Sequence, residues 1–458
     1  MNVKKLVCML LALVLSCGAL ALAEGDDLQA QLDAANARIA ELEAEVELYR
    51  PYYENQIVAE FGNGGIIWLE DAQAEFEAAS SAYAQYGLSI DDYAAEVKQQ
   101  ILETLVQKEV LNQKATELGL DQLDEEALKN LEAEAAENFE TYIDSYKAYF
   151  AAEDASDEDA RQQTIAALES YGMTQETLVE QMKESYVSEQ LHSFVTKDVA
   201  VTDEDIHAAY DQMVSDAEAS YANDRSYNTA RNSGEAIAWN PEGYRAVKHV
   251  LIKFGDEQAQ KYNELQTTLT NLNSELEALD APAEAADADT AADVEAEATP
   301  EPRSREEIQA DIAAVATQIE ALYSELLPKA QQVVDEFEGG ADFDSLIEKY
   351  NEDTGMNKEP TATNGYAVAA NSTTWDPAFT EGAMSIEAVG QISAPIYGKS
   401  GIHIIYYLSD ITPGAVPFEE IAEAAEANAL NAKISETYNA QVQAWMEEAA
   451  PVYHTDRF

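Results

Sequence analysis

Gly401-Ile402-His403-Ile404-Ile405-Tyr406-Tyr407 is an apolar run broken by one histidine, and Lys248-His249-Val250-Leu251-Ile252 has the same pattern earlier in the chain. Short apolar runs rich in β-branched residues predict buried strands. A lone histidine on such a strand is more often a hydrogen-bonded core residue than a functional one. Here two of only five histidines fall on the two strands expected at the centre of one sheet, which favours a shared site.

The segments between these strands follow an informative order. They are the helix-like Phe343-Asp344-Ser345-Leu346-Ile347-Glu348-Lys349-Tyr350, then Asn351-Glu352-Asp353, Trp375-Asp376-Pro377-Ala378-Phe379 and Val389-Gly390-Gln391-Ile392-Ser393-Ala394-Pro395-Ile396. This order resembles the parvulin family of peptidyl-prolyl cis/trans isomerases from Tyr244 to about Asp410, with one large insertion. The resemblance implies an α+β domain that binds a proline-containing peptide and speeds rotation about the X-Pro bond, without a cofactor.

The resemblance also assigns roles to individual residues. It implies catalytic positions at His249, Asp353 and His403, with Phe379 as the aromatic floor of the proline slot and Trp375 beside it. Two imidazoles and a carboxylate can form a hydrogen-bonded relay next to an apolar wall. Each residue also has a plain structural interpretation: Trp375 and Phe379 as core residues, and Asp353 as the cap of a turn. No metal site is expected from these residues.

Two departures from the family leave a second function open. The usual Gly-Gly-Asp-Leu-Gly turn is reduced to Asn364-Gly365-Tyr366-Ala367-Val368, and Gly398 stands where a hydroxyl residue is frequent. These changes can reshape the rim of the slot or lower its activity. The alternative is therefore a non-catalytic extracytoplasmic chaperone or docking protein with a degenerate parvulin domain. A third interpretation is a surface protein that assembles through its coiled-coil segments.

The N-terminal half is predicted to be a hairpin followed by helices. The hairpin spans Ile57–Leu69, and helices are predicted over 92–118, 124–150, 156–171, 174–197 and from 201 through 213. Asp124, Ser156 and Thr174 stand where helix N-caps belong. Such a block before a parvulin domain is similar to the chaperone half of envelope foldases of the SurA and PrsA type. That similarity implies that the last helix, from Pro417 to about Ala449, packs back on the N-terminal helices.

The large insertion is predicted to be a helical arm. Leu265, Leu269, Leu272, Leu276 and Leu279 form one heptad seam, and Ile308, Ile312, Val315, Ile319, Leu322 and Leu326 form a second. Two seams joined by a link predict an antiparallel hairpin. The link, 280–305, is rich in alanine, acidic residues and proline, which predicts a disordered loop. A client-gripping arm, a docking arm and a neutral insertion all remain open.

The first residues and the charge indicate where the protein works. Lys4 and Lys5, an apolar run and Ala21-Leu22-Ala23 predict a secretory signal peptide over 1–23, with no transmembrane span in the mature chain. A competing interpretation makes Cys17 a lipidated N-terminus. The net charge of -62 repels phosphate backbones, so nucleic acid is excluded as a partner. The expected partners are unfolded or proline-containing secreted polypeptides.

Together these observations predict an α+β fold: a mostly α-helical chaperone module built from both chain ends, plus a parvulin-like domain with an inserted antiparallel helical hairpin. The predicted organisation is a signal peptide over 1–23, a coiled-coil-like helix over 24–50, a helical module over 51–243, the isomerase-like domain over 244–411 and a C-terminal helix over 412–458. The insertion is expected at about 256–330.

Overall fold

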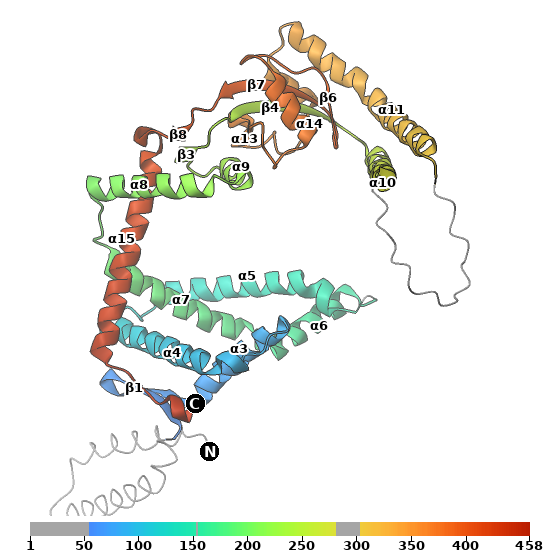
Figure 1. Ribbon diagram of the computed structural model, residues 1–458. Coiled ribbons are helices and arrows are strands. Elements are labelled where there is room, and N and C mark those ends of the chain that lie inside the picture. The colour runs from blue at the N-terminus through green and yellow to red at the C-terminus, as the bar shows by residue number, and fades with distance from the viewer. Residues whose placement is uncertain (1–54, 153, 281–302) are drawn as a thin grey trace, which may run out of the picture. The chain divides into compact units, whose positions relative to one another are not determined.

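The computed structural model describes residues 55–152, 154–280 and 303–458, and Figure 1 shows its helices and strands. The predicted signal peptide, Cys17, the coiled-coil-like helix and nearly all of the predicted loop over 280–305 lie outside the described residues. The chain forms two compact units, Met1–Val199 with Ile434–Phe458 (unit 1) and Ala200–Lys433 (unit 2). The predicted fold class, a mostly helical α+β protein, is confirmed. Among the described helices, none combines the length and the apolar character that a membrane crossing requires.

Unit 1 is a helical body with one small sheet. Its elements are β1 (Ile57–Phe61), η2 (Gly62–Gly64), β2 (Gly65–Trp68), α3 (Leu69–Gln85), η3 (Asp91–Tyr93), α4 (Ala94–Glu117), α5 (Glu125–Phe150), α6 (Asp157–Ser170), α7 (Gln175–Thr196), the end of α15 (Phe418–Ala449), β9 (Val452–Tyr453) and η4 (Thr455–Arg457). The three predicted N-caps are confirmed, because Asp124, Ser156 and Thr174 each accept a hydrogen bond from a backbone N–H of the first helical turn.

Both chain ends contribute to the core of unit 1. The sheet order is β2-β1-β9, with Ala59 of β1 opposite Tyr453 of β9. Buried residues of β1 and α4, among them Val58 and Leu102, pack with Trp445 near the end of α15. The C-terminus accordingly lies beside β1 in Figure 1. The module therefore cannot be completed without the last residues of the chain.

Unit 2 is built around a four-stranded antiparallel sheet. Its elements are α8 (Asp203–Ser220), α9 (Asp224–Ser233), β3 (Trp239–Asn240), β4 (Arg245–Lys253), α10 (Asp256–Asp280), α11 (Arg305–Glu338), α12 (Phe343–Tyr350), α13 (Thr361–Asn364), β5 (Tyr366–Val368), α14 (Pro377–Ser385), β6 (Ile396–Gly398), β7 (Gly401–Asp410), β8 (Gly414–Ala415) and the start of α15. Helices α8 and α9 fall in this unit, although the predicted boundaries lay at 243/244 and 411/412.

The sheet places the two predicted histidine strands at its centre. Its order is β5-β4-β7-β6, and β4 and β7 pair along their whole length. Because side chains alternate between the faces of a strand, His249 and Leu251 point to one face and Lys248 and Val250 to the other. Helices α11 and α12 cover the face of Lys248, where Phe343 of α12 stacks on Tyr406 of β7. Helix α14 covers the face of the histidines.

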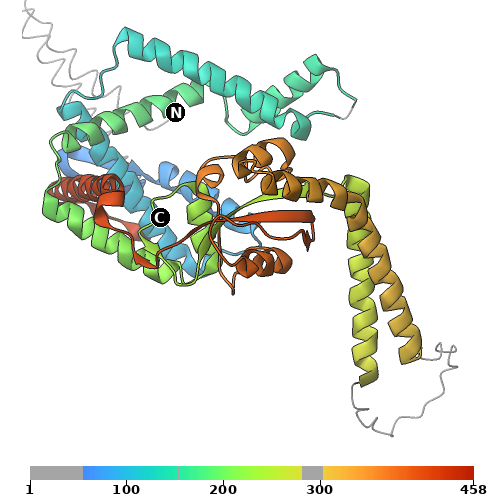
Figure 2. The ribbon, with the colours of Figure 1, turned by 90° about the horizontal axis from the view of Figure 1, so that it is seen from above.

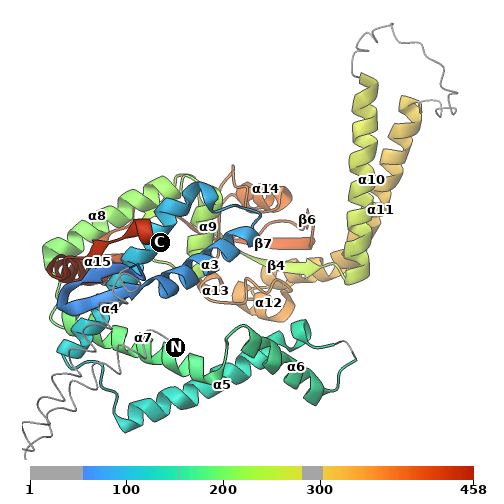
Figure 3. The same cartoon turned by 90° about the horizontal axis from the view of Figure 1, so that it is seen from below.

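The predicted antiparallel arm is present. Helices α10 and α11 lie side by side in Figures 2 and 3 and project from the sheet of unit 2. Their apolar contacts are made by Leu265, Leu269, Leu272, Leu276, Ile308, Ile312, Val315, Ile319 and Leu322, whereas Leu279 is 42% exposed. Tyr323, Ala330 and Val333 of α11 belong instead to the core beside the sheet. The insertion expected at about 256–330 therefore includes residues that the core of unit 2 uses.

Candidate active site

The two histidines meet because of the register of β4 and β7. His249 lies opposite Ile405, and Leu251 lies opposite His403, so the histidines are diagonal neighbours on one face of the sheet. Their rings stack at 5.1 Å with Nδ1 atoms 2.9 Å apart, although 154 positions separate them in the chain. Both are almost fully buried. One Nδ1 must donate a hydrogen and the other accept it, so the tautomers of the two rings are linked.

Asp353 completes the predicted trio. Its Oδ2 accepts hydrogen bonds from His249 Nε2 at 2.8 Å and from the Tyr366 hydroxyl at 2.8 Å, and its Oδ1 accepts one from the backbone N–H of Gly355. The loop is fastened to β4 by Asn351, whose Oδ1 accepts from the backbone N–H groups of both Leu251 and Asp353. The carboxylate is therefore held at the edge of the sheet rather than free to move with a surface turn.

The surroundings of the trio determine its charges. Burial alone raises the pKa of Asp353, but the hydrogen bond from His249 and its charge, with the bonds from Gly355 and Tyr366, outweigh burial and hold that pKa well below the usual range. Burial, reinforced by the nearby His249, lowers the pKa of His403 to about 3. Near neutral pH, Asp353 is therefore ionised and His403 is neutral.

Two aromatic residues stand beside this polar cluster. Phe379, on α14, is 3% exposed and contacts the rings of His249 and His403 edge-on, at 5.1 and 5.2 Å between ring centroids. Trp375 lies against Tyr366 at 4.4 Å, and its indole Nε1–H donates to the backbone oxygen of Ala367 at 2.8 Å. Phe379 therefore serves both the core and the site, while Trp375 is partly exposed.

All five predicted site residues line one cavity of about 240 Å³. Its walls are formed by His249, Leu251, Asp353, Tyr366, Thr374, Trp375, Asp376, Phe379, Lys399, Ser400 and His403. Tyr366 was not singled out from the sequence, although it follows Gly365 in the reduced turn. A register argument could have found it, since Tyr366 lies opposite Val247, two residues from His249 on the same face. Burial and the negative Asp353 raise the pKa of Tyr366, so its hydroxyl remains a donor.

The structure gives a physical reason for the glycine that remains in the reduced turn and for the glycine at position 398. At Gly365 the φ angle is +67° and a Cβ atom would lie 2.6 Å from the backbone oxygen of Val247, so this position of the reduced turn requires glycine. At Gly398 a Cβ atom would lie 2.8 Å from Nε2 of His403 and crowd the ring. Gly398 therefore leaves room for His403 in its present orientation. Within the described ranges no group of three or more metal-ligating side chains is found.

The comparisons with known proteins agree with this geometry. Residues 297–409 match the family described as "Rotamase: PPIC-type PPIASE domain", which confirms the predicted resemblance to parvulin-type isomerases. A curated relative, foldase protein PrsA of Clostridium botulinum strain Langeland, is 22% identical over 82% of this chain and 81% of its own length. Foldase protein PrsA of Clostridium perfringens strain 13 is 21% identical over 79% of this chain and 73% of its own length.

Solved structures were also compared with the chain. The crystal structure of foldase protein PrsA from Streptococcus pneumoniae covers 83% of this chain and 91% of its own, at 15% identity with a TM-score of 0.24. That of PrsA from Bacillus subtilis covers 86% and 93%, at 15% identity with a TM-score of 0.22. The fold of unit 2 is defined by its sheet order, β5-β4-β7-β6, and by the register of β4 with β7.

Proposed function

We propose that this chain, which carries a peptidyl-prolyl isomerase domain of the PPIC type, is an exported foldase that isomerises X-Pro bonds in secreted proteins and holds their unfolded segments. The observation that carries the proposal is the single cavity in which His249, Asp353 and His403 lie beside Phe379 and Trp375. A proline ring is small and apolar, and a partly open cavity of about 240 Å³ with an aromatic wall matches it.

The proposed mechanism needs no proton transfer to the substrate. A planar amide resists rotation by roughly 20 kcal/mol because twisting breaks the resonance of the C–N bond. Twisting also localises the nitrogen lone pair and reduces the negative charge on the carbonyl oxygen, so the twisted amide needs less solvation by water than the planar one. Phe379, Trp375 and Leu251 would exclude water on one side of the bond and so favour the twisted form.

The polar cluster has a positioning role in this mechanism. Asp353 orients His249, and His249 in turn orients His403 through the linked Nδ1 atoms. Because His403 stays neutral, it adds no positive charge to the floor of the cavity that would attract water. Lys399 and Ser400, from the turn between β6 and β7, stand at the rim where they can donate to a peptide carbonyl.

A protease-coupled assay tests the isomerase activity. Full-length protein would be mixed with a series of tetrapeptides that differ in the residue before proline, and the rate of cis-to-trans conversion measured. We expect acceleration that is lost, by about tenfold or more, in Phe379→Ala. If folded wild-type protein does not accelerate any member of the series, the alternative holds: a non-catalytic chaperone or docking protein with a degenerate parvulin domain.

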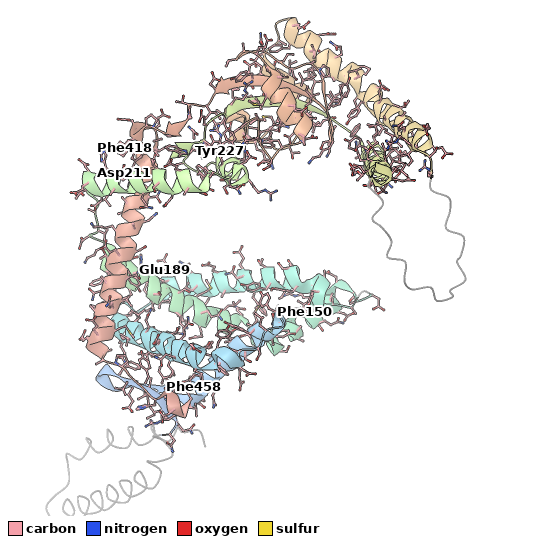
Figure 4. The ribbon with its side chains drawn as sticks, in the orientation of Figure 1. Phe150, Glu189, Asp211, Tyr227, Phe418 and Phe458 are labelled. Atoms are coloured by element: carbon pink, nitrogen blue, oxygen red, sulfur yellow. The ribbon has the colours of Figure 1, made fainter. Side chains whose placement is uncertain are left out.

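The holdase part of the proposal rests on exposed aromatic rings in unit 1. Tyr149 at the end of α5 and Tyr171 at the end of α6 are 80% and 75% exposed, and both rings contact Phe150, which Figure 4 labels. Aromatic rings left in water on a strongly acidic chain suit unfolded segments that carry apolar and basic residues. A chain of net charge -62 also attracts such segments over longer distances.

An aggregation assay tests this surface. The double variant Tyr149→Ser/Tyr171→Ser should suppress aggregation of a basic unfolded client less well than wild type, without a change in tetrapeptide isomerisation. Tyr86→Ser is the matched control, because Tyr86 at the end of α3 is 82% exposed. Equal suppression by the double variant and the control would contradict the assignment of this surface.

A further inference from the structure

We propose that Asp224, on α9, is a positioning residue for the candidate active site: its carboxylate fixes residues 372–374 and thereby sets where Thr374 and Trp375 stand at the rim of the cavity. This inference rests on the proposed function, since it names a further residue on which substrate binding at that site depends. Asp224 lies outside both the predicted isomerase span, 244–411, and the matched residues, 297–409.

The carboxylate of Asp224 accepts hydrogen bonds from three places in the chain: residues 372–374, Tyr244 and Asn228. Oδ2 accepts from the backbone N–H groups of Thr373 and Thr374, each at 2.8 Å, and from the Thr374 hydroxyl at 2.7 Å. Oδ1 accepts from the Ser372 hydroxyl at 2.9 Å, the Tyr244 hydroxyl at 2.7 Å and the Asn228 side-chain amide at 3.0 Å. All six donors are neutral N–H or O–H groups, so only an ionised, acceptor-only side chain satisfies them.

Asp224 is ionised, as an acceptor of six hydrogen bonds must be. Burial alone raises the pKa of Asp224, but the hydrogen bonds from Thr374, Tyr244 and Thr373 outweigh burial and lower it. The carboxylate therefore stays ionised across the physiological range of pH. Unlike Asp353, Asp224 accepts from no histidine, so its hydrogen bonds fix geometry without linking it to the protonation of the trio.

The fixed segment leads directly into the cavity wall. Ser372 also accepts a hydrogen bond from the backbone N–H of Ala369, which closes the turn after β5. Trp375 follows Thr374 and is held at its other end by the bond from its indole to Ala367. Trp375 is thus anchored through its indole by β5 and through the residue before it by Asp224. Removal of the second anchor frees Thr374 and Trp375 to move, while the trio keeps its own hydrogen bonds.

Helix α9 is a firm support for this anchor. Its Asn223 cap accepts from two backbone N–H groups, and Gly234 ends the helix in the left-handed region, with φ of +83°. Tyr227, labelled in Figure 4, is fully buried, and its ring meets that of Tyr244 edge-on at 4.8 Å. Tyr227 and Tyr244 form one apolar cluster with Ala367 and Ala369 beside β5. Asp224 therefore stands on a capped helix that is packed against β5.

The test compares two carboxylates at the same helical position. Asp224→Asn keeps the shape of the side chain but replaces one carboxylate oxygen by an NH2 group. At least one hydrogen of that group then points toward the N–H or O–H donors that the oxygen accepted from. Asp203 is the first residue of α8 as Asp224 is of α9, and both lie in unit 2, so Asp203→Asn removes the same charge at a helix N-terminus without touching the cavity. Both variants would be made in the full chain.

We expect Asp224→Asn to raise KM for the tetrapeptides about tenfold while kcat changes less than about twofold, because lost hydrogen bonds to a charged group loosen the binding wall and not the trio. Asp203→Asn should leave both constants unchanged. Asp224→Glu, which keeps an ionised acceptor, should raise KM less than Asp224→Asn does. A fall in kcat at constant KM, or unchanged constants with only a lower Tm, would overturn the positioning role.

A second measurement keeps the inference independent of the proposed activity. Quenching of the fluorescence of Trp375 by acrylamide, taken as the difference between each protein and its Trp375→Phe counterpart, should increase in Asp224→Asn and not in Asp203→Asn. If wild type isomerises no peptide, the proposed function fails. The quenching measurement still shows whether Asp224 holds Trp375 in place. If Asp224→Asn does not fold, Ser372→Ala and Thr374→Val replace it, and unchanged Trp375 quenching in both would overturn the inference.

Discussion

The candidate site and the helical arm are both part of unit 2, yet their contacts arise in opposite ways. In the site, His249 meets Asp353 and His403 across 104 and 154 positions of the chain, and the partners are polar and buried. In the arm, apolar residues recur three or four positions apart, and in its outer part they pack against the facing helix. The site therefore depends on the register of a sheet, whereas the arm depends on local periodicity.

This difference predicts how each region responds to change. A buried polar network loses most of its contribution to stability when one member is removed, because the remaining groups stay desolvated without a hydrogen-bond partner. A leucine seam is a sum of similar apolar contacts and loses stability in small steps. Substitutions in the site should therefore have large and specific effects, and changes in the outer arm small ones.

The largest effect is expected at Phe379. Phe379→Ala should cost about 3–5 kcal/mol of stability, as truncation of a buried phenylalanine does, and should also lower kcat/KM by about tenfold or more. Phe343→Ala is the matched control: Phe343 has the same 3% exposure but packs on the opposite face of the sheet. It should lose similar stability while kcat/KM, measured where both variants are folded, stays near wild type. Equal losses of kcat/KM would show that Phe379 acts only through the core.

The next effect is a dependence of stability on pH that His403 causes. The pKa of His403 is lowered to about 3 in the folded chain, against about 6.5 when unfolded. Between these values the unfolded chain binds a proton that the folded chain does not, so stability falls as pH drops from about 6.5 toward 3, by up to about 1.4 kcal/mol per pH unit. Denaturant unfolding of wild type and His403→Gln at several pH values measures this slope. A variant as steep as wild type would contradict the assignment.

A smaller effect is expected at Tyr366. Tyr366→Phe removes one donor from Asp353 but leaves His249 bonded to it, so kcat/KM should fall about three- to tenfold. Tyr350→Phe is the control, since Tyr350 is also 8% exposed and donates to a carboxylate, that of Glu336 at 2.6 Å, away from the cavity. The tetrapeptide assay should separate the two variants. If both leave the rate unchanged, Tyr366 contributes only to packing.

The smallest effect is expected in the arm. Deletion of 268–317 with a short glycine-rich connection removes the outer seam but keeps Tyr262 and Tyr323, which pack against Phe254 beside the sheet. Tetrapeptide isomerisation should stay within about twofold of wild type, because loop length at a surface costs little. Loss of activity in a folded deletion variant would show that the arm is part of the catalytic architecture. The site and the arm would then not differ as proposed.

The same contrast explains how much could be predicted from the sequence. The arm was predicted because its periodicity is local. Two predicted seam residues differ: Leu279 lies too near the end of α10 to be covered, and Leu326 packs against the core beside the sheet. The five candidate site residues were predicted through a family resemblance, and all five line one cavity in the structure. Tyr366 and Asp224 were missed because their partners are set by strand register and by a turn, neither of which leaves a periodic pattern. Asp224 in particular reads as an ordinary first-turn residue of a helix.

The pairing of β1 with β9 sets the order in which the protein can fold as it is synthesised. Ribosomes make the chain from its N-terminus, and all of unit 2 exists once residue 433 has emerged, 25 residues before the end at 458. Unit 1 contains the earliest described residues, but its sheet waits for Val452 and Tyr453. Until then the edge of β1 between Ile57 and Phe61 presents unpaired N–H and C=O groups to any other strand. The helical module is thus begun first and finished last.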